Sequence, residues 1–214
     1  MTEAVKPAGL RAARVAENEE RIVRAAHELF ARDGYQATTL TAVADAAGVA
    51  HRTVYVRFGT KAALLKRVID VALFGDLAPV DVVSRAWYRT ATTAPTLQER
   101  IAALATGSAR LMASAADVIA VAREAEPAEP LLAAAAHAGR AATREAIRTF
   151  WTRARDDGLL PPRCDLAWLA DTTSVLAHAE TYLLMRETLS MTPEGYEKWL
   201  ATTWRRMAAA AAPD

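Results

Sequence analysis

The sequence of 214 residues predicts an all-α fold. Its composition and alanine runs favour helix, and its helix-breaking residues lie at spacings that separate one helix from the next. Hydrophobic residues make up 52% of the chain and charged residues only 24%, so a sizeable core can form. Alanine runs at 133–136 and 208–212, with few glycines and few β-branched stretches, favour helix over strand. Proline, glycine and capping residues divide the chain into about nine predicted helices.

The first seventeen residues mix proline, glycine and charge, and we expect residues 1–17 to form a flexible arm. The first helix is predicted from about residue 18 to residue 33, where Gly34 ends it. Its buried stripe follows the helical repeat and consists of Ile22, Ala26, Leu29 and Phe30.

Residues 34–61 have the pattern of a helix-turn-helix. Thr39 is placed to cap a short helix over 40–47, whose apolar residues share one face: Leu40, Val43, Ala44 and Ala47. Gly48 lies where the chain must stop and reverse, a position that favours a left-handed backbone. In the second helix, over about 49–58, Val54 and Phe58 hold one face against the first helix and leave the other face free.

Caps and breakers also define the later helices. Thr60 caps a fourth helix, and Thr96 with Glu99 forms a capping box at the start of a long one. The predicted helices after the fourth cover about 82–92, 96–125, 130–157, 165–190 and the segment from Thr192 onward. The last two have broad apolar faces, so this hairpin either packs on its own domain or pairs with a second copy as a four-helix bundle.

The helix-turn-helix block resembles the DNA-binding domain of the tetracycline-repressor (TetR) family of transcription regulators. The resemblance rests on an ordered set of residues within a run of about thirty: Phe30, Gly34-Tyr35, Thr38-Thr39-Leu40, Val43-Ala44, Ala47-Gly48-Val49, Thr53-Val54-Tyr55, Phe58, Thr60-Lys61 and Leu64-Leu65. Ala50 stands where the family usually has a capping serine, and Arg52 where glycine or proline is frequent. The resemblance implies a three-helix DNA-binding domain with a helix-turn-helix over 18–62 and a helical effector-binding and dimerisation domain over 63–214.

The predicted recognition helix carries residue types that suit double-stranded DNA. Arg52 can donate two hydrogen bonds to guanine, His51 can donate or accept one, and Val56 can contact a thymine methyl. Arg57 can reach a base edge or a phosphate. The residues expected at backbone phosphates are Thr39, Thr53, Tyr55 and Lys61, of which Lys61 also opens a helix whose N-terminus favours anions.

The rest of the chain carries no enzyme signature, since it lacks a phosphate-binding glycine loop, HExxH, GxSxG and a His/Cys set at metal-ligand spacing. We therefore expect no catalytic residue, metal or cofactor. Long helices can still enclose a largely apolar ligand pocket, for which the candidates are Trp87, Tyr88, Met112, Phe150, Trp151 and His178. Members of the family usually dimerise through their last two helices, which implies an interface made by Trp168, Val175, Tyr182, Tyr196, Trp199, Leu200 and Trp204.

Charge and cysteine content narrow the class of protein further. Residues 1–70 carry 11 Lys and Arg against 8 Asp and Glu, whereas the remainder carries 15 against 17, which fits a nucleic-acid module on a neutral body. The one cysteine, Cys164, excludes an internal disulfide framework. No signal-like segment and no apolar run of membrane-spanning length are present, so a cytoplasmic protein without a membrane partner is expected.

Together with the resemblance, these patterns lead us to expect a homodimeric repressor that binds an inverted-repeat operator and is released by a small, largely apolar effector. By the resemblance, an effector bound in the body would move the fourth helix and change the separation of the two recognition helices. Two alternatives stay open. One is a regulator of the same family without a small-molecule effector, and the other is an all-α carrier or enzyme whose N-terminal helices do not bind DNA.

Overall fold

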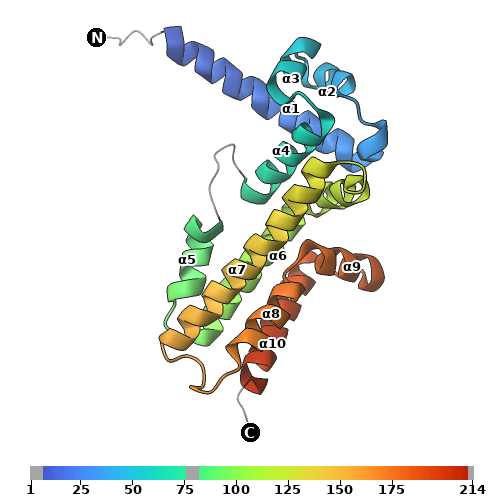
Figure 1. Ribbon diagram of the computed structural model, residues 1–214. Coiled ribbons are helices and arrows are strands. Elements are labelled where there is room, and N and C mark those ends of the chain that lie inside the picture. Colours follow the sequence, from blue (N-terminus) through green and yellow to red (C-terminus); the bar gives the residue numbers. More distant parts are fainter. Residues whose placement is uncertain (1–6, 76–81, 212–214) are drawn as a thin grey trace, which may run out of the picture. The chain divides into compact units, whose positions relative to one another are not determined.

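The computed structural model describes residues 7–75 and 82–211, and every regular element within these ranges is helical (Figure 1). The elements are α1 (Pro7–Ala37), α2 (Leu40–Ala47), α3 (His51–Phe58), α4 (Lys61–Phe74), the 3₁₀ turn η1 (Val82–Ser84), α5 (Ala86–Thr93), α6 (Leu97–Ala125), α7 (Pro130–Asp156), α8 (Leu166–Leu176), α9 (Ala179–Leu189) and α10 (Pro193–Ala210). The all-α prediction is confirmed.

The chain divides into two compact units. Unit 1 comprises residues 1–77 and 117–133, and unit 2 comprises residues 78–116 and 134–214. Unit 1 therefore contains α1 to α4, the end of α6 and the beginning of α7, and both of these long helices continue into unit 2. The predicted boundary between residues 62 and 63 differs from this division, because α4 and the α6–α7 turn pack with the N-terminal helices.

Unit 1 is built around the apolar stripe that the sequence predicts on α1. Ile22, Ala26 and Phe30 are at most 1% exposed, and they pack with Val43 and Ala44 of α2 and with the inner face of α4. The core of the unit also contains Val54, Leu64, Leu65, Val68, Val118, Val121 and Leu132. Since α3 contributes only Val54 to the fully buried set, most of its surface is left outside the core.

Helix α1 begins earlier than predicted, and beyond the predicted stop at Gly34 a short helical segment continues to Ala37. It begins at Pro7, so the described part of the expected flexible arm, residues 7–17, is helical, and residues 1–6 lie outside the described residues. Gly34 interrupts it with φ 76°, in the left-handed region, as the predicted stop requires. The Thr38 hydroxyl then donates to the Gly34 carbonyl at 2.8 Å and fixes the turn that leads into α2.

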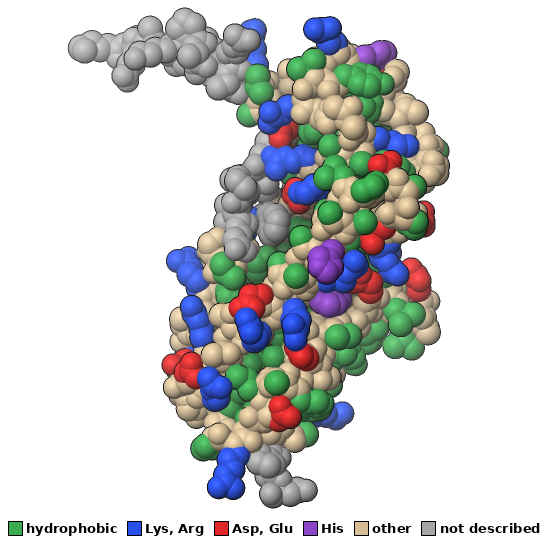
Figure 2. All heavy atoms as spheres, viewed as in Figure 1, with side chains coloured by type: hydrophobic (Ala, Val, Ile, Leu, Met, Phe, Trp, Pro, Cys, Tyr) green, Lys and Arg blue, Asp and Glu red, His purple; other side chains and the backbone are tan. Residues whose placement is uncertain are grey.

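Unit 2 has an aromatic core. The side chains of Phe150, Trp151, Tyr196 and Trp204 are fully buried, and the Trp151 indole donates to the Thr173 hydroxyl at 2.7 Å. The predicted capping box is present, because the Thr96 N–H donates to the Glu99 carboxylate at 3.1 Å and the Glu99 N–H donates to the Thr96 hydroxyl at 3.3 Å. Over the surface of this unit acidic and basic side chains lie beside one another (Figure 2), in ion pairs such as those between Arg144 and Asp171, Arg148 and Glu145, and Arg155 and Asp156.

The prediction of one helix over 165–190 is wrong, because the chain breaks at His178 into α8 and α9. In an unbroken helix the carbonyls of Val175 and Leu176 would accept from the backbone four residues ahead. Here the Thr181 hydroxyl donates to Val175 O at 2.7 Å, and the Tyr196 hydroxyl donates to Leu176 O at 2.6 Å. Two side chains thus donate to carbonyls at the end of α8, where the Val175 carbonyl also accepts from the His178 N–H at 3.3 Å, and His178 is extended.

One described helix, α6, is long and apolar enough to meet a length and composition test for a membrane span. The core helix of a globular protein passes the same test, and 56% of the residues in the relevant stretch are buried inside the protein. The stretch is therefore weak evidence for a membrane span.

Candidate nucleic-acid interface

The α2–α3 turn has the backbone geometry that the sequence predicts. The Thr39 hydroxyl accepts from the Ala42 N–H at 3.0 Å and caps α2. Gly48 has φ 62° and ψ 41°, and Val49 N–H donates to the Ala44 carbonyl at 3.0 Å, so α2 ends in a left-handed cap. The Arg21 guanidinium donates to the Gly48 carbonyl at 3.0 Å and ties this turn to α1.

The residue that precedes α3, Ala50, has no side-chain group that can cap the helix. Ala50 has the extended backbone of an N-cap, with φ −63° and ψ 137°, but makes no side-chain hydrogen bond to the first turn. Replacing Ala50 with serine should therefore raise the free energy of unfolding by about 1 kcal/mol, because a hydroxyl would satisfy one open N–H group. Urea denaturation of wild type and Ala50→Ser measures the difference, with Ala50→Val as the control that lacks the acceptor. Equal midpoints for the serine and valine variants would contradict the prediction.

The outward face of α3 carries three of the residues predicted to bind DNA. Arg52 is exposed, Tyr55 is 51% exposed and Val56 is 75% exposed, while Val54 on the opposite side is fully buried. The amphipathic pattern thus places a guanidinium, a phenol and an apolar side chain on one solvent-facing surface. These groups suit guanine, phosphate and a thymine methyl respectively. Thr53 is half-buried at the start of this helix, and Thr39 is exposed at the start of α2.

Two of the predicted DNA contacts are already engaged within the chain. The His51 ring lies 2.7 Å from the Asp45 carboxylate, and both side chains are more than half exposed. Arg57 forms an ion pair with Glu19 of α1. His51 can therefore approach a base with its orientation set by Asp45, whereas a base or phosphate would have to compete with Glu19 for Arg57.

Glu19 is a residue of this site that the sequence interpretation missed. It is 5% exposed, and besides Arg57 it accepts from the Arg67 guanidinium Nε of α4 at 2.9 Å. Burial by itself would raise the pKa of the Glu19 carboxyl, but the hydrogen bonds and charges of Arg57 and Arg67 outweigh it and lower that pKa below its ordinary value. The sequence does indicate that residue 19 lies on the buried face of α1, since this position is three residues before Ile22 and continues the apolar stripe.

Lys61 also has partners within unit 1. Its ammonium donates to the Tyr35 carbonyl at 2.6 Å and to the Gln36 carbonyl at 3.3 Å, and it lies 4.2 Å from the centre of the Tyr35 ring. The Tyr35 hydroxyl in turn donates to Glu129 at 2.6 Å, in the turn between α6 and α7. The prediction for Lys61 named only a phosphate partner, and neither Tyr35 nor Glu129 was among the predicted site residues.

The predicted pocket residues lie in unit 2, where most belong to the core. Phe150 and Trp151 are fully buried, and the Tyr88 hydroxyl donates to the Ala146 carbonyl at 2.7 Å. The Met112 side chain is 7% exposed. Trp87 packs so closely on α6 that a methyl group added at Gly107 would lie 2.1 Å from its ring.

His178 differs from the other five predicted pocket residues. Its Nε2 atom is buried and has no hydrogen-bond partner among the described residues. Burial lowers the pKa of this ring, so the imidazole is neutral at pH 7 and Nε2 can donate or accept one hydrogen bond.

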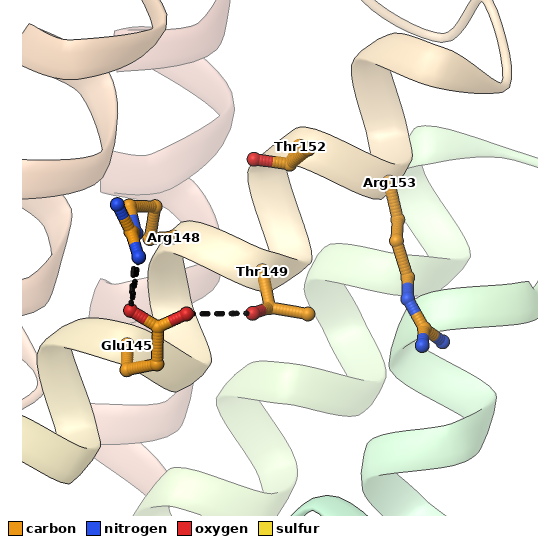
Figure 3. Close-up of a pocket in the computed structure, with 5 residues that line it drawn as sticks. All are labelled: Glu145, Arg148, Thr149, Thr152 and Arg153. Carbon is orange, nitrogen blue, oxygen red and sulfur yellow. Dashed lines mark hydrogen bonds and ion pairs between the residues drawn. The ribbon is translucent and has the colours of Figure 1, made fainter.

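One described pocket opens on the surface of α7 and is lined by charged and hydroxyl-bearing residues (Figure 3). It is lined by Glu145, Arg148, Thr149, Thr152 and Arg153. Glu145 accepts from Arg148 at 2.5 Å and from Thr149 at 3.5 Å, and Arg153 donates to the Thr92 hydroxyl at 3.3 Å. None of the predicted pocket residues lines it, and the five residues that do are all charged or hydroxyl-bearing, so it does not correspond to the predicted apolar ligand site.

The predicted dimer residues fall into two groups. Tyr182, Tyr196, Leu200 and Trp204 are at most 3% exposed within a single chain, so their assignment to an interface is wrong and they belong to the core of unit 2. Trp168 and Val175 are 43% and 56% exposed, and Trp199 is half-buried. The heptad repeat covered both a buried and an outward face of these helices, and spacing alone could not separate the two.

Comparison with known proteins identifies the N-terminal segment. Residues 22–68 match the family model described as bacterial regulatory proteins, tetR family. The N-terminal domain is a TetR-family domain. The match runs from the stripe of α1 through the α2–α3 turn into α4, and so contains Arg52, Tyr55 and Val56. No curated protein matches the sequence.

The whole chain has the TetR-family fold. PfmR of Thermus thermophilus, a TetR-family transcriptional regulator, superimposes with a TM-score of 0.63 at 20% identity, over 88% of this chain and 97% of its own. A TetR transcription regulator of Haloarcula marismortui gives 0.67 at 16% identity, over 91% and 97%. The complex of SmeT with triclosan gives 0.67 at 18% identity, over 92% of each chain.

Proposed function

We propose that this chain is a cytoplasmic, sequence-specific DNA-binding transcriptional regulator that represses from a palindromic operator as a homodimer. The observation that carries the proposal is the outward face of α3, where Arg52, Tyr55 and Val56 are exposed within a TetR-family domain. A helix that packs inward through Val54 and the partly buried Phe58 can present its outward surface to a major groove.

A homodimer would place two such helices about one duplex turn apart, roughly 34–36 Å, and an inverted repeat is the sequence they would read. Support for pairing comes from α8, where Trp168 and Val175 are exposed seven residues apart on one face. Solvent-exposed tryptophan beside valine is the kind of surface that a second copy would bury.

Release by a small, largely apolar effector is the second part of the proposal. SmeT, which shares the fold, is known in complex with triclosan, and we propose that unit 2 of this chain also accepts a small molecule. His178 is the predicted pocket residue best suited to a polar contact, because its buried Nε2 has no partner among the described residues. The effector must bind the form that does not bind the operator more tightly than the form that does.

Selection of duplexes from a random pool tests the proposal most directly. Purified protein should enrich one inverted repeat and bind it as a dimer in fluorescence anisotropy at fixed salt. Affinity should fall steeply as salt rises, as expected for several phosphate contacts. Failure to enrich any sequence by an intact, folded protein would overturn the assignment and favour an all-α carrier or enzyme.

A substitution on α8 tests the dimer separately. Trp168→Glu is expected to weaken the dimer by about 2 kcal/mol, because it places a charge where an aromatic anchor would be buried. Sedimentation velocity at micromolar concentration measures the monomer fraction. Leu184→Glu is the matched control, since Leu184 is exposed on α9 outside the proposed interface. Two variants that sediment like wild type would contradict the placement of the interface.

A further inference from the structure

Tyr35 joins three parts of unit 1 through its ring, its hydroxyl and its backbone carbonyl. Its ring stacks on Phe30 with centroids 6.1 Å apart, its carbonyl accepts from the Lys61 ammonium, and its hydroxyl donates to Glu129. Tyr35 is 5% exposed, and its hydrogen bonds with Glu129 and Lys61 are partly buried. Burial, followed by the hydrogen bond and charge of Glu129, raises the pKa of the phenol well above its ordinary value. The phenol therefore stays a donor.

Glu129 is held firmly on its own side of this contact. It lies between the end of α6 and the start of α7, where its N–H donates to the Ala125 carbonyl at 3.0 Å. Its own carbonyl accepts from the N–H groups of Leu132 and Ala133 at 2.9 and 3.1 Å. The backbone of the turn is thus fixed by both helices, and the Glu129 carboxylate projects from it onto Tyr35.

The Lys61 ammonium is also held by hydrogen bonds, at the end of α4 that we propose to face DNA. Two of the three ammonium N–H groups have acceptors at Tyr35 and Gln36, and the Tyr35 ring lies against the charge. Lys61 is the first residue of α4, whose open backbone N–H groups and dipole already favour an anion. The two carbonyls therefore set the direction of the third N–H group at an anion-binding helix end.

We propose that Tyr35 and Glu129 are positioning residues for operator binding, which fix the Lys61 ammonium where it meets a backbone phosphate. This inference rests on the proposed DNA-binding function. Preorganising the lysine removes the entropy loss of ordering a long side chain on contact with DNA. Because α6 and α7 continue into unit 2, displacement of their shared turn would act on Lys61 through the hydrogen bond between Tyr35 and Glu129.

The variants that test this remove single groups. Tyr35→Phe deletes only the hydroxyl and keeps the ring against Phe30 and Lys61, and Glu129→Ala deletes the acceptor. Glu129→Gln keeps an acceptor oxygen, and Glu124→Ala removes an exposed carboxylate at the same end of α6. Each variant is made in the wild-type and the Lys61→Ala background, and circular dichroism establishes that it is folded at the assay temperature.

Anisotropy on the selected operator at fixed salt gives the decisive comparison. Tyr35→Phe and Glu129→Ala should each weaken binding about threefold to tenfold and lower the slope of log affinity against log salt by up to about 0.9, the effect of one phosphate contact. Glu129→Gln and Glu124→Ala should bind like wild type. In the Lys61→Ala background neither Tyr35→Phe nor Glu129→Ala should weaken binding further, since all act through one contact.

Two results would overturn the inference. Unchanged affinity and salt slope in the folded Tyr35→Phe and Glu129→Ala variants would show that the hydrogen bond serves stability alone. An equal loss of affinity in both backgrounds would show that Tyr35 and Glu129 act independently of Lys61. Failure of the proposed function is distinguishable from both, because wild type and Glu124→Ala would then bind no selected duplex.

Discussion

Glu19→Ala is expected to lower the free energy of unfolding by about 2 kcal/mol, since it leaves two arginines without their carboxylate. The Glu19 side chain is only 6% exposed, while those of Arg57 and Arg67 are 50% and 25% exposed. Water can therefore resolvate the guanidinium groups in part, which keeps the loss below that of a fully buried pair. Urea unfolding, monitored by circular dichroism, measures this loss of unfolding free energy.

The neighbouring residue provides a matched control for this prediction. Glu20 is exposed on the same helix, and Glu20→Ala should change the free energy of unfolding by less than about 0.5 kcal/mol. If both variants lost the same free energy of unfolding, the cause would be the removal of a negative charge from α1 and not the loss of the contact with Arg57 and Arg67.

The same carboxylate makes stability depend on pH. Because the pKa of Glu19 is lower in the folded state, its contribution is fully present above the unfolded value of about 4.3 and disappears as the pH falls through the folded value. Glu19→Gln should therefore be less stable than wild type at pH 7, and the difference between the two should shrink as the pH falls below the unfolded value. A difference that stays constant down to pH 3 would contradict the assignment.

Arg52→Ala should have the largest effect on DNA recognition. Loss of a bidentate contact to guanine is expected to weaken binding to the selected operator by about 1–3 kcal/mol and to relax preference at one base position in each half-site. Anisotropy with the operator and with its single-base variants measures both effects. Arg52 is exposed and α3 is held by Val54, so the unfolding curve should not move.

Arg24→Ala is the control for charge alone, because Arg24 is exposed on α1 and the variant loses the same positive charge. It should bind every operator variant with nearly the wild-type order of preference. If Arg52→Ala weakened all duplexes equally, Arg52 would contact a phosphate and the base reading would have to come from other residues of α3.

The elements that the sequence predicted best are those set by local chemistry. The bounds of α2, Leu40 and Ala47, follow from a threonine cap and a glycine in the left-handed region, and both signals lie within ten residues. The capping box at Thr96 and the proline start of α10 were likewise found from short patterns. Apolar periodicity then assigned the inner face of α1 and of α3 correctly.

Features that depend on distant residues could not be predicted in this way. The break at His178 lies where the Tyr196 hydroxyl, twenty residues beyond Leu176, donates to the Leu176 carbonyl. The hydrogen bond from Tyr35 to Glu129 joins residues ninety-four positions apart, and no local sequence pattern predicts it. The same limit explains Tyr182 and Trp204, whose spacing suited an interface although the neighbouring helices already enclose them.

On the proposed DNA-binding function, the ion pair between Glu19 and Arg57 constrains how the specificity of α3 can change. Arg57 contributes both to the surface of α3 and to the stability of unit 1, so a substitution there alters recognition and folding together. Arg52 and Val56 are exposed and have no hydrogen-bonding partner among the described residues, so they can vary without loss of a tertiary contact. Divergent or engineered specificities should therefore accumulate at positions 52 and 56, while position 57 changes only together with position 19.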